Sequence, residues 1–381
     1  MYIHTDLFAV QSSKKTGSPC GDSYAVMRDT NATTLVLADG LGSGIKAHIA
    51  ANMCVARLSG LIRMGMSVRE AFMAVSATMD EVWGTGEPFA VFTIARILNN
   101  GQTTVLSYEM PAPLLINKSY CSVLRNRVYT RGKAIIHESD CFIDKGEGLA
   151  LLSDGITQAG IGKYFPMGWD VEGVRAFVQS RLPVERLDGE QLSKEIHNQA
   201  RGYWPEGKGD DCSVLVAVNR RGVIVNLLTG PPSNMSDDAQ WVNHFNDAEG
   251  IHLIAGGSTA KIAARELNRR IEVVEAGNAI TPPAYLISGF ELVTEGMVTL
   301  NQVYHLLDED PADYPADSSA AELAAHLKMA DRINVWLGQA PNASDGNIEF
   351  KQQGLLNREK IAAKIVKRLR EQGKLVVVEK K

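Results

Sequence analysis

Residues 34–44 read Thr-Leu-Val-Leu-Ala-Asp-Gly-Leu-Gly-Ser-Gly, and this stretch decides the fold of the first half of the chain. Its apolar half is short and rich in residues that favour a buried strand. Asp39 ends that strand at the edge of the expected sheet, and Gly40, Gly42 and Gly44 allow the backbone to turn before a helix begins. Taken alone, the stretch also fits a plain strand-turn-helix connection in which Asp39 caps the helix.

The composition excludes several classes of protein. The 381 residues are enough for two domains of ordinary size, and 45% hydrophobic with 22% charged residues is typical of a globular protein. The formal net charge of −5 argues against a general nucleic-acid binder. No apolar run reaches the roughly 18 residues of a membrane-spanning helix, and the N-terminus lacks the basic and apolar regions of a signal peptide.

The five cysteines are odd in number, scattered and without a CxxC pair, which predicts reduced thiols. We therefore expect a cytoplasmic protein with neither a nucleic-acid nor a membrane partner. The sequence does not determine the oligomeric state, and a homodimer is one of the states left open.

Over residues 1–222, turns and apolar runs predict the order strands, two helices, strands, helices, final strand. The two helices are expected at residues 43–64 and 68–83, with Ser67 as the N-cap of the second. Residues 7–26 are expected to form a first hairpin. This order predicts an α+β sandwich whose helices cover the outer faces of the sheets.

A turn-rich run around Gly230-Pro231-Pro232 predicts a linker over residues 223–240. Beyond it, strands alternate with helices over residues 241–381, and residues 292–307 are predicted to be mainly helical. The alternation favours a smaller C-terminal α/β layer domain with a partly parallel sheet, in a regulatory or ligand-sensing role.

Four acidic motifs stand at the end of an apolar strand or just before one: Gly21-Asp22, Asp39-Gly40, Ser153-Asp154-Gly155 and Gly209-Asp210-Asp211. This placement can gather four aspartates at one end of a sandwich, where like charges raise each other's pKa unless a cation is present. Mg²⁺ and Mn²⁺ prefer such oxygen ligands, and no histidine beside the motifs suggests zinc. Two such ions can share a carboxylate, bind phosphate and activate a water for in-line attack.

On these motifs, in this order, the chain resembles the bacterial type 2C metal-dependent protein phosphatases, and most closely the branch typified by stage II sporulation protein E. The likeness covers about residues 1–220. It implies an α/β/β/α-type sandwich phosphatase domain, two Mn²⁺ or Mg²⁺ ions as cofactors, and hydrolysis of phosphoserine or phosphothreonine in bacterial signalling.

The resemblance also assigns roles to individual residues. Asp39 would bridge both metals and the Gly40 carbonyl would complete one metal site. Asp154 and Asp211 would bind the first metal, and Asp22 would bind the second mostly through water. In this branch the two helices after the Asp-Gly motif, here 43–64 and 68–83, form a switch through which regulatory partners act, although amphipathic cover for the sheet is an alternative reading.

The residues leave several points open around this site. His4 and His48 are candidates for a general acid, but a satisfied or exposed histidine fits each of them too. Asp210 is expected to form the turn rather than bind metal, because successive residues of an extended strand point to opposite sides. Cys20 and Cys212 flank the acidic motifs, either as a redox control or as small core residues.

In the second domain, Gly256-Gly257-Ser258-Thr259 follows an apolar strand and precedes a helix, the geometry of an anion site at a helix N-terminus. A structural tight turn is the alternative, because the lysine of a P-loop and the spacing of a dinucleotide fingerprint are missing. Glu295 is either a site residue or a helix-start carboxylate, and the basic helix 358–370 either meets an acidic partner or is a solvated face.

The sequence thus predicts a metal-dependent serine/threonine phosphoprotein phosphatase whose phosphorylated substrate is unknown. Two alternatives remain open at this point. One is a phosphatase of small phosphorylated metabolites, which the same metal chemistry permits. The other is a weakly catalytic metal-binding signalling scaffold, although the intact set of four aspartates argues against it.

Overall fold

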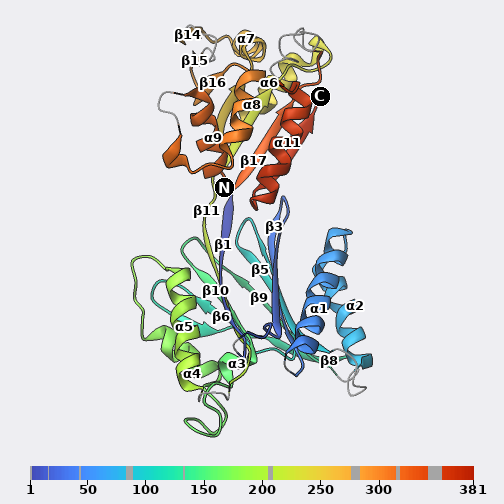
Figure 1. Ribbon diagram of the computed structural model, residues 1–381, viewed down its shortest axis with the longest axis vertical. Coiled ribbons are helices and arrows are strands. Elements are labelled where there is room, and N and C mark those ends of the chain that lie inside the picture. The colour runs from blue at the N-terminus through green and yellow to red at the C-terminus, as the bar shows by residue number, and fades with distance from the viewer. Residues whose placement is uncertain are drawn as a thin grey trace. The chain divides into compact units, whose positions relative to one another are not determined.

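The computed structural model of the chain describes residues 2–381 except 16, 43, 83–88, 132–133, 205–208, 276–283, 315–317 and 342–353. It divides into two compact units, Ile3–Arg221 and Gly222–Lys381 (Figure 1). Among the described residues, no helix is both long enough and apolar enough to span a membrane.

The N-terminal unit contains two sheets in which every described strand pair is antiparallel. The five-stranded sheet has the order β1 (Ile3–Ser12), β11 (Cys212–Arg221), β10 (Gly148–Leu152), β6 (Leu114–Ile116) and β7 (Cys121–Val123). The six-stranded sheet has the order β2 (Asp22–Arg28), β3 (Ala32–Gly40), β4 (Ala90–Leu98), β5 (Gln102–Tyr108), β9 (Ala134–Phe142) and β8 (Arg127–Arg131).

Helices cover the outer face of each sheet (Figure 1). The six-stranded sheet packs against α1 (Ile45–Arg63) and α2 (Val68–Val82). The five-stranded sheet packs against α3 (Asp154–Thr157), α4 (Asp170–Gln179) and α5 (Gly189–Tyr203). A third apolar cluster, with Leu37 from β3 and Leu151 from β10, fills the space between the sheets. The predicted α+β sandwich with outer helices is confirmed.

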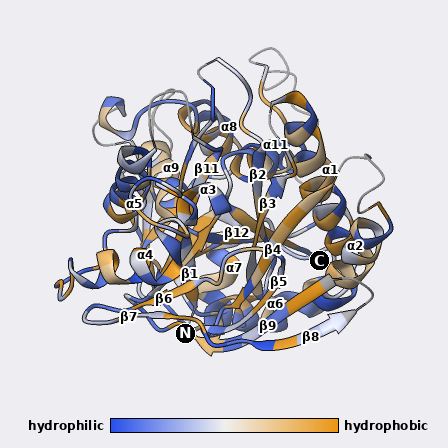
Figure 2. Ribbon diagram, turned by 90° about the horizontal axis from the view of Figure 1, so that it is seen from below, coloured by the Kyte–Doolittle hydropathy of each residue, from blue (hydrophilic) through white to orange (hydrophobic). Residues whose placement is uncertain are grey.

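Alternation along β3 explains how one strand serves two cores. Leu35 and Leu37 face the other sheet, whereas Val36 and Ala38 face α1 and α2. Both helices carry hydrophobic and hydrophilic residues, as expected of amphipathic cover (Figure 2).

The boundaries of α1 and α2 match the prediction, although Ser43 and Trp83 lie outside the described residues. Ser67 forms a capping box with Glu70: the Glu70 backbone N–H donates to Ser67 Oγ at 3.2 Å, and the Ser67 N–H donates to Glu70 Oε2 at 2.9 Å. The predicted N-cap is therefore confirmed.

The predicted hairpin over residues 7–26 is wrong. β1 pairs with β11 along its whole length, whereas β2 pairs with β3, so the two strands belong to different sheets. The intervening residues 13–21 are longer than a hairpin loop and carry the chain from one sheet to the other.

The C-terminal unit has one seven-stranded sheet in the order β14 (Ile271–Glu275), β15 (Ala284–Ile287), β16 (Leu292–Thr294), β13 (Ile251–Ala255), β12 (Ile224–Thr229), β17 (Arg332–Leu337) and β18 (Leu375–Lys380). The strands β16, β13, β12, β17 and β18 are parallel to one another, and the β14–β15 and β15–β16 pairs are antiparallel.

One face of this sheet packs against α8 (Met297–Leu306), α9 (Ser319–Met329) and α11 (Arg358–Glu371). The other face packs against α6 (Asp238–Asp247) and α7 (Gly257–Glu266). Two short 3-10 helices, η1 (Met235–Asp237) and η2 (Pro311–Asp313), complete the described elements.

Two details of the second half differ from the sequence-based expectation. The linker predicted over 223–240 contains β12, η1 and the start of α6, and all six residues of β12 are buried in the centre of the sheet. Residues 292–294 of the predicted helix form β16 instead, because they pair in parallel with β13 before α8 begins. β12 and β16 are both short apolar strands. The turn residues that follow each of them indicate where the strand ends but not that a strand precedes them.

Candidate active site

Two of the four predicted aspartates lie on neighbouring strands of the six-stranded sheet. Asp22 is the first residue of β2, Asp39 is the penultimate residue of β3, and the two are register partners. Residues directly opposite in an antiparallel pair place their Cβ atoms about 4.5–5.5 Å apart on the same face. The pairing of β2 with β3 therefore brings both carboxyl groups together, with the Asp22 residue only 3% exposed.

The other two aspartates lie at one end of the five-stranded sheet. Asp154 follows β10 as the first residue of α3, and Asp211 directly precedes β11, which pairs antiparallel with β10. Ser153 and Ser213 hold these strand ends together, because the Ser153 N–H donates to the Ser213 carbonyl at 3.0 Å and the Ser213 N–H donates to Ser153 Oγ at 2.9 Å.

One hydrogen bond connects the two pairs of aspartates across the sheets. Ser213 Oγ on β11 donates to Asp22 Oδ2 on β2 at 2.6 Å, and both residues are buried. The Lys14 backbone N–H donates to Asp211 Oδ1 at 2.8 Å, and Gln158 Nε2 donates to Asp154 Oδ2 at 2.9 Å. All four predicted aspartates thus gather where the strand ends of the two sheets meet.

Two glycines permit this close approach. A Cβ atom on Gly155 would lie 2.0 Å from the Asp211 carbonyl oxygen, so only glycine can follow Asp154 here. A Cβ atom on Gly40 would lie 2.0 Å from the carbonyl oxygen of Ala47 in α1, so glycine lets the first turns of that helix approach the strand end. The glycines beside the acidic motifs therefore serve packing as well as turning.

The electrostatic cost of the cluster is large. Burial, followed by the charges of Asp22 and Asp154, raises the pKa of Asp39 to about 10. Burial raises the pKa of Asp22 to about 7 even though the Ser213 hydroxyl opposes the shift. Carboxyl groups in this position are stable as carboxylates only beside a compensating positive charge.

The donor set fits a hard divalent cation. Asp22 Oδ1 is buried without a hydrogen-bond partner, and the cluster offers carboxylate oxygens with no histidine among the four acidic motifs. Within the described ranges, no three acidic, histidine or cysteine side chains already converge tightly enough to enclose a metal ion. The strands therefore deliver the ligands to one place, and side-chain rotation has to complete the coordination.

The residues next to the aspartates have local roles. Asp210 Oδ1 accepts from the Asp211 N–H at 3.0 Å and lies 3.7 Å from Lys14 Nζ, which supports the turn-forming role. Burial raises the pKa of Cys20 and of Cys212 to about 12, so both are neutral thiols at physiological pH. This protonation state argues against redox control, and Cys212 is a buried core residue whereas Cys20 is only partly buried.

The two candidate general acids, His4 and His48, lie at different distances from the site. In the pairing of β1 with β11, Ser12 lies opposite Cys212, at the end of β1 that is near the site. His4 lies opposite Arg220, at the other end of β1. Eight residues of strand separate His4 from Ser12 by roughly 26 Å, so His4 is excluded. His48 Nδ1 donates to the Cys20 carbonyl at 2.8 Å and Nε2 accepts from Asn52 at 3.1 Å, so His48 is a satisfied histidine beside the site.

The structure adds residues that the sequence did not indicate. Lys14 approaches Asp210 and Asp211 across about 200 positions of sequence. His197 of α5 is 7% exposed, bonds Ser12 Oγ at 2.8 Å, and has its pKa lowered by burial. Neither contact follows a local pattern: Lys14 reaches Asp211 because β1 pairs with β11, and His197 reaches Ser12 because α5 packs beside β1.

The weaker sequence signals lie in the other unit. Gly256 is the N-cap of α7, and Thr259 Oγ1 accepts from the Gly230 N–H at 2.9 Å, which favours the structural reading of Gly256, Gly257, Ser258 and Thr259. Glu295 accepts from the Val298 N–H at 3.1 Å and is therefore the expected helix-start carboxylate. In α11, five apolar residues are buried and Lys367 is 80% exposed, which supports an amphipathic helix with a solvated basic face.

Comparison with known proteins gives one family. The family described as Stage II sporulation protein E (SpoIIE) matches residues 29–220, which include Asp39, Asp154 and Asp211. No curated protein sequence gives a significant match.

Several solved structures are similar to this chain. One is the PP2C phosphatase domain and a fragment of the regulatory domain of SpoIIE from Bacillus subtilis, at 15% identity and a TM-score of 0.49, covering 57% of this chain and 64% of that one. Another contains the RsbU and RsbW domains of a Mycobacterium tuberculosis protein, at 15% identity and 0.48, covering 64% and 68%. A third is RsbX in complex with magnesium, at 20% identity and 0.40, covering 57% and 96%. At these values the likeness carries no inference about activity.

Proposed function

This chain belongs to the stage II sporulation protein E (SpoIIE) family, and from that premise we propose that its N-terminal unit is a metal-dependent serine/threonine phosphoprotein phosphatase in bacterial signalling. The observation that carries the proposal is the cluster of Asp22, Asp39, Asp154 and Asp211 at the strand ends, in which the raised pKa values of Asp22 and Asp39 call for a cation. The alternatives of a small-metabolite phosphatase and of a metal-binding scaffold become outcomes of the test below.

In the proposed site, Asp39 holds the central position, because it faces Asp22 on β2 and interacts with Asp154 from the other sheet. Asp154 and Asp211 complete the ligands from the five-stranded sheet, and Gly40 offers its carbonyl. Divalent ions bound there supply Lewis-acid polarisation of phosphoryl oxygens and a water of lowered pKa. We propose two Mn²⁺ or Mg²⁺ ions, which the presence of two aspartates on each of the two sheets supports.

The protein's own residues orient these groups. Ser213 fixes the Asp22 carboxylate, Gln158 fixes that of Asp154, and the Lys14 N–H fixes that of Asp211. The Lys14 ammonium, 3.7 Å from Asp210, stands at the edge of the cluster as a cation for the substrate phosphate. Once these side chains had rotated around a metal ion, the same hydrogen bonds would limit their further reorganisation when the phosphomonoester binds.

A regulatory partner at α1 and α2 belongs to the same proposal. Ile45, Ile49 and Met53 follow one another at helical spacing on α1 and are 67%, 46% and 60% exposed. Exposed apolar side chains in one stripe support a docking surface for another protein. Because the first turn of α1 packs against Gly40 at the end of β3, a partner on α1 can act on the metal ligands.

The remaining assignments are also proposals. We assign the unit that ends at Arg221 to the phosphatase domain. The C-terminal α/β domain is assigned a regulatory or ligand-sensing role, and its start moves from residue 241 to Gly222 because β12 belongs to its sheet. The free cysteines support a cytoplasmic location. The proposal also includes a homodimer, in which the partner that binds α1 and α2 is a second copy of this chain.

The test is hydrolysis of an aryl phosphate and of a phosphothreonine peptide with Mn²⁺, with EDTA, and for Asp39→Asn. Asp144→Asn is the matched control, since Asp144 is an exposed aspartate of the same unit outside the cluster. Turnover that requires Mn²⁺ and Asp39 but not Asp144 supports the proposal. Turnover of small phosphate esters with no hydrolysis of phosphopeptides indicates the metabolite phosphatase. Mn²⁺ binding without any hydrolysis, in the presence of candidate partners, indicates the scaffold.

A further inference from the structure

The segment between α3 and α4 folds into a compact loop whose two ends meet (Figure 1). The Trp169 N–H donates to the Ala159 carbonyl at 2.9 Å. A Cβ atom on Gly168 would lie 2.6 Å from the Cα atom of Gln158, so the backbone closes tightly at this point. Residues 158–169 therefore form an Ω-loop, a kind of surface loop that frequently has a function.

Aromatic side chains anchor the base of this loop. The Tyr203 ring of α5 lies edge-on to the ring of Phe165 at a centroid distance of 5.0 Å and to that of Trp169 at 5.3 Å. The neighbouring Trp204 donates from Nε1 to the Gly155 carbonyl at 2.9 Å. The loop is thus held to the strand end that carries a predicted metal ligand.

The loop begins at the candidate active site itself. Gln158, its first residue, donates from Nε2 to Asp154 Oδ2 at 2.9 Å. Because Gly168 packs on the backbone of Gln158, the last residues of the loop return to the same place. Both ends of the loop therefore lie beside the Asp154 carboxylate.

Three large apolar side chains of the loop remain exposed. Ile161 is 46%, Tyr164 53% and Met167 78% exposed, and the Tyr164 ring packs on Tyr203 at a centroid distance of 6.0 Å. Single exposed apolar side chains are common in proteins. Three of them on one anchored loop form a patch of the kind that marks an interaction site.

An exposed apolar residue also follows the acidic motif of the other sheet. Leu41 comes directly after Gly40 at the end of β3 and is 72% exposed. Its backbone N–H donates to the Phe89 carbonyl at 2.9 Å, so its backbone position is fixed. Both sheets thus place exposed apolar side chains next to the aspartates that they contribute.

The position of these side chains indicates what covers them. A phosphate group that reaches the aspartates brings the rest of its molecule against the loop. A small polar metabolite offers no apolar surface there. A polypeptide extends about 3.3 Å per residue on either side of a phosphorylated residue and carries side chains that match the loop.

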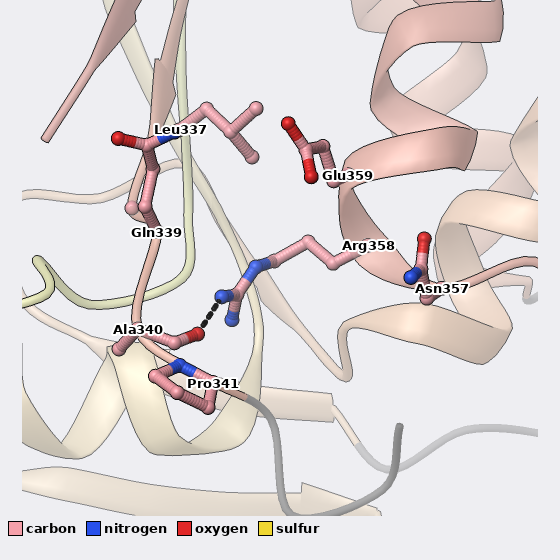
Figure 3. Close-up of a pocket in the computed structure, with 8 residues that line it drawn as sticks. Leu337, Gln339, Ala340, Pro341, Asn357, Arg358 and Glu359 are labelled. Carbon is pink, nitrogen blue, oxygen red and sulfur yellow. Dashed lines mark hydrogen bonds between the residues drawn. The ribbon is translucent and has the colours of Figure 1, made fainter. Parts of the chain in front are cut away.

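The hollow at the start of α11 is not an alternative for such a chain. It has a volume of about 150 Å³ and is lined by residues 337–341 and 357–359 (Figure 3). The Arg358 side chain points toward the segment after β17 and donates to the Ala340 carbonyl, so its charge already has a partner. The volume is also below the roughly 300–1,000 Å³ of a site for a drug-sized molecule.

We propose that the loop 158–169, together with Leu41, is the docking surface for the phosphoprotein substrate and selects substrates with apolar side chains beside the phosphorylated residue. The inference rests on the proposed phosphatase function and specifies what the same site recognises. The metal centre holds the phosphate group that all substrates share. Discrimination among substrates therefore depends on contacts outside it, and buried aromatic and apolar side chains contribute most to such contacts.

The test compares two labelled phosphothreonine peptides, one with leucine residues on either side of the phosphothreonine and one with serine in their place. Binding to the full chain is measured by fluorescence polarisation in EDTA, so that this arm does not depend on phosphatase activity. We expect the leucine peptide to bind about fivefold or more tightly than the serine peptide. Tyr164→Ser and Met167→Ser should each reduce this preference to less than about twofold. Met167 is mostly exposed, so its replacement keeps the fold.

Tyr120→Ser and Met64→Ser are the matched controls. Tyr120, 57% exposed, lies between β6 and β7, and Met64, 81% exposed, lies at the C-terminal end of α1, away from the aspartates. Both control variants should keep the preference of the unchanged protein for the leucine peptide. With Mn²⁺, the same preference should appear in kcat/KM for hydrolysis of the two peptides.

The outcomes separate the docking surface from the phosphatase function. If neither peptide is hydrolysed while the loop-dependent preference persists in EDTA, the phosphatase function fails and the docking surface stands. The inference is overturned if the unchanged protein binds both peptides alike. It is also overturned if the loop variants keep the preference as fully as the control variants do.

Discussion

Replacing Ser213 with alanine should weaken metal binding although Ser213 touches no metal in the proposed site. Its hydroxyl donates to Asp22 Oδ2 at 2.6 Å and accepts from Gln11 Nε2 at 2.8 Å, and the residue is fully buried. Asp22 Oδ1 already lacks a partner. Ser213→Ala therefore leaves a buried carboxylate free to turn away from Asp39.

The structure allows the magnitude to be worked out. A hydrogen bond to a charged group contributes about 1.5–3 kcal/mol, so we expect the metal-free protein to lose about 2–3 kcal/mol of unfolding free energy. Groups that orient a metal ligand typically change metal affinity or activity by about 10–100-fold when removed. We therefore expect the Mn²⁺ dissociation constant to rise at least tenfold, about 1.4 kcal/mol in binding free energy.

The assay is calorimetry of Mn²⁺ binding together with urea unfolding in EDTA. Ser193→Ala is the matched control, because Ser193 is equally buried in the same unit and donates to the Glu190 carbonyl at 2.9 Å, within α5. That variant should lose about 0.5–1.5 kcal/mol of stability and keep the Mn²⁺ affinity of the unchanged protein. If both serine variants bind Mn²⁺ as tightly as the unchanged protein, Ser213 does not orient a metal ligand and the reasoning fails.

Three further predictions follow from the two units. Lys14→Ala should raise KM for a phosphopeptide about threefold to tenfold with little change in kcat, because Lys14 stands at the edge of the aspartate cluster; steady-state kinetics with an unchanged KM would contradict this. Phe72→Ala should lower the unfolding free energy by about 3–5 kcal/mol, since Phe72 is fully buried and its ring centroid lies 5.1 Å from that of Phe92; a loss below about 1 kcal/mol in urea titrations would refute it. Burial lowers the pKa of His252, so this residue binds more protons in the unfolded chain than in the folded one. Its contribution to the free energy of unfolding is therefore present above about pH 6.5 and lost as the pH falls. His252→Gln should flatten the dependence of that free energy on pH between pH 5 and 7.5, and an unaltered dependence would count against this prediction.

The sequence predicted the site where local signals were strong. The apolar run before Asp39 and the glycines after it indicate a strand end by themselves, and β3 pairs with the next strands along the chain on either side of it. The sequence could not show that Lys14 contacts Asp211, because this contact depends on the pairing of β1 with β11 across about 200 residues. Contacts of this kind have no period or spacing that a single sequence displays.

The same limit explains the error at β12. Gly230-Pro231-Pro232 is a strong turn signal, and for this reason a linker was predicted around it. The six residues just before this turn form the strand β12 instead. β12 pairs with β13 and with β17, and this position in the sheet buries Leu227 on one face and Leu228 on the other. The paired residues of β13 and β17 lie about 25 and 108 positions further along the chain. Short central strands of parallel sheets carry no alternation that distinguishes them from other apolar runs.

The most direct test of the central claim is anomalous diffraction at the manganese edge from crystals of the full chain soaked in Mn²⁺. The account predicts two anomalous peaks among Asp22, Asp39, Asp154 and Asp211, with the Asp39 carboxylate between them. In crystals of Asp39→Asn the peaks should be lost or greatly reduced. Absence of manganese at the four aspartates in the unchanged protein, or its binding elsewhere with activity retained, would contradict the account.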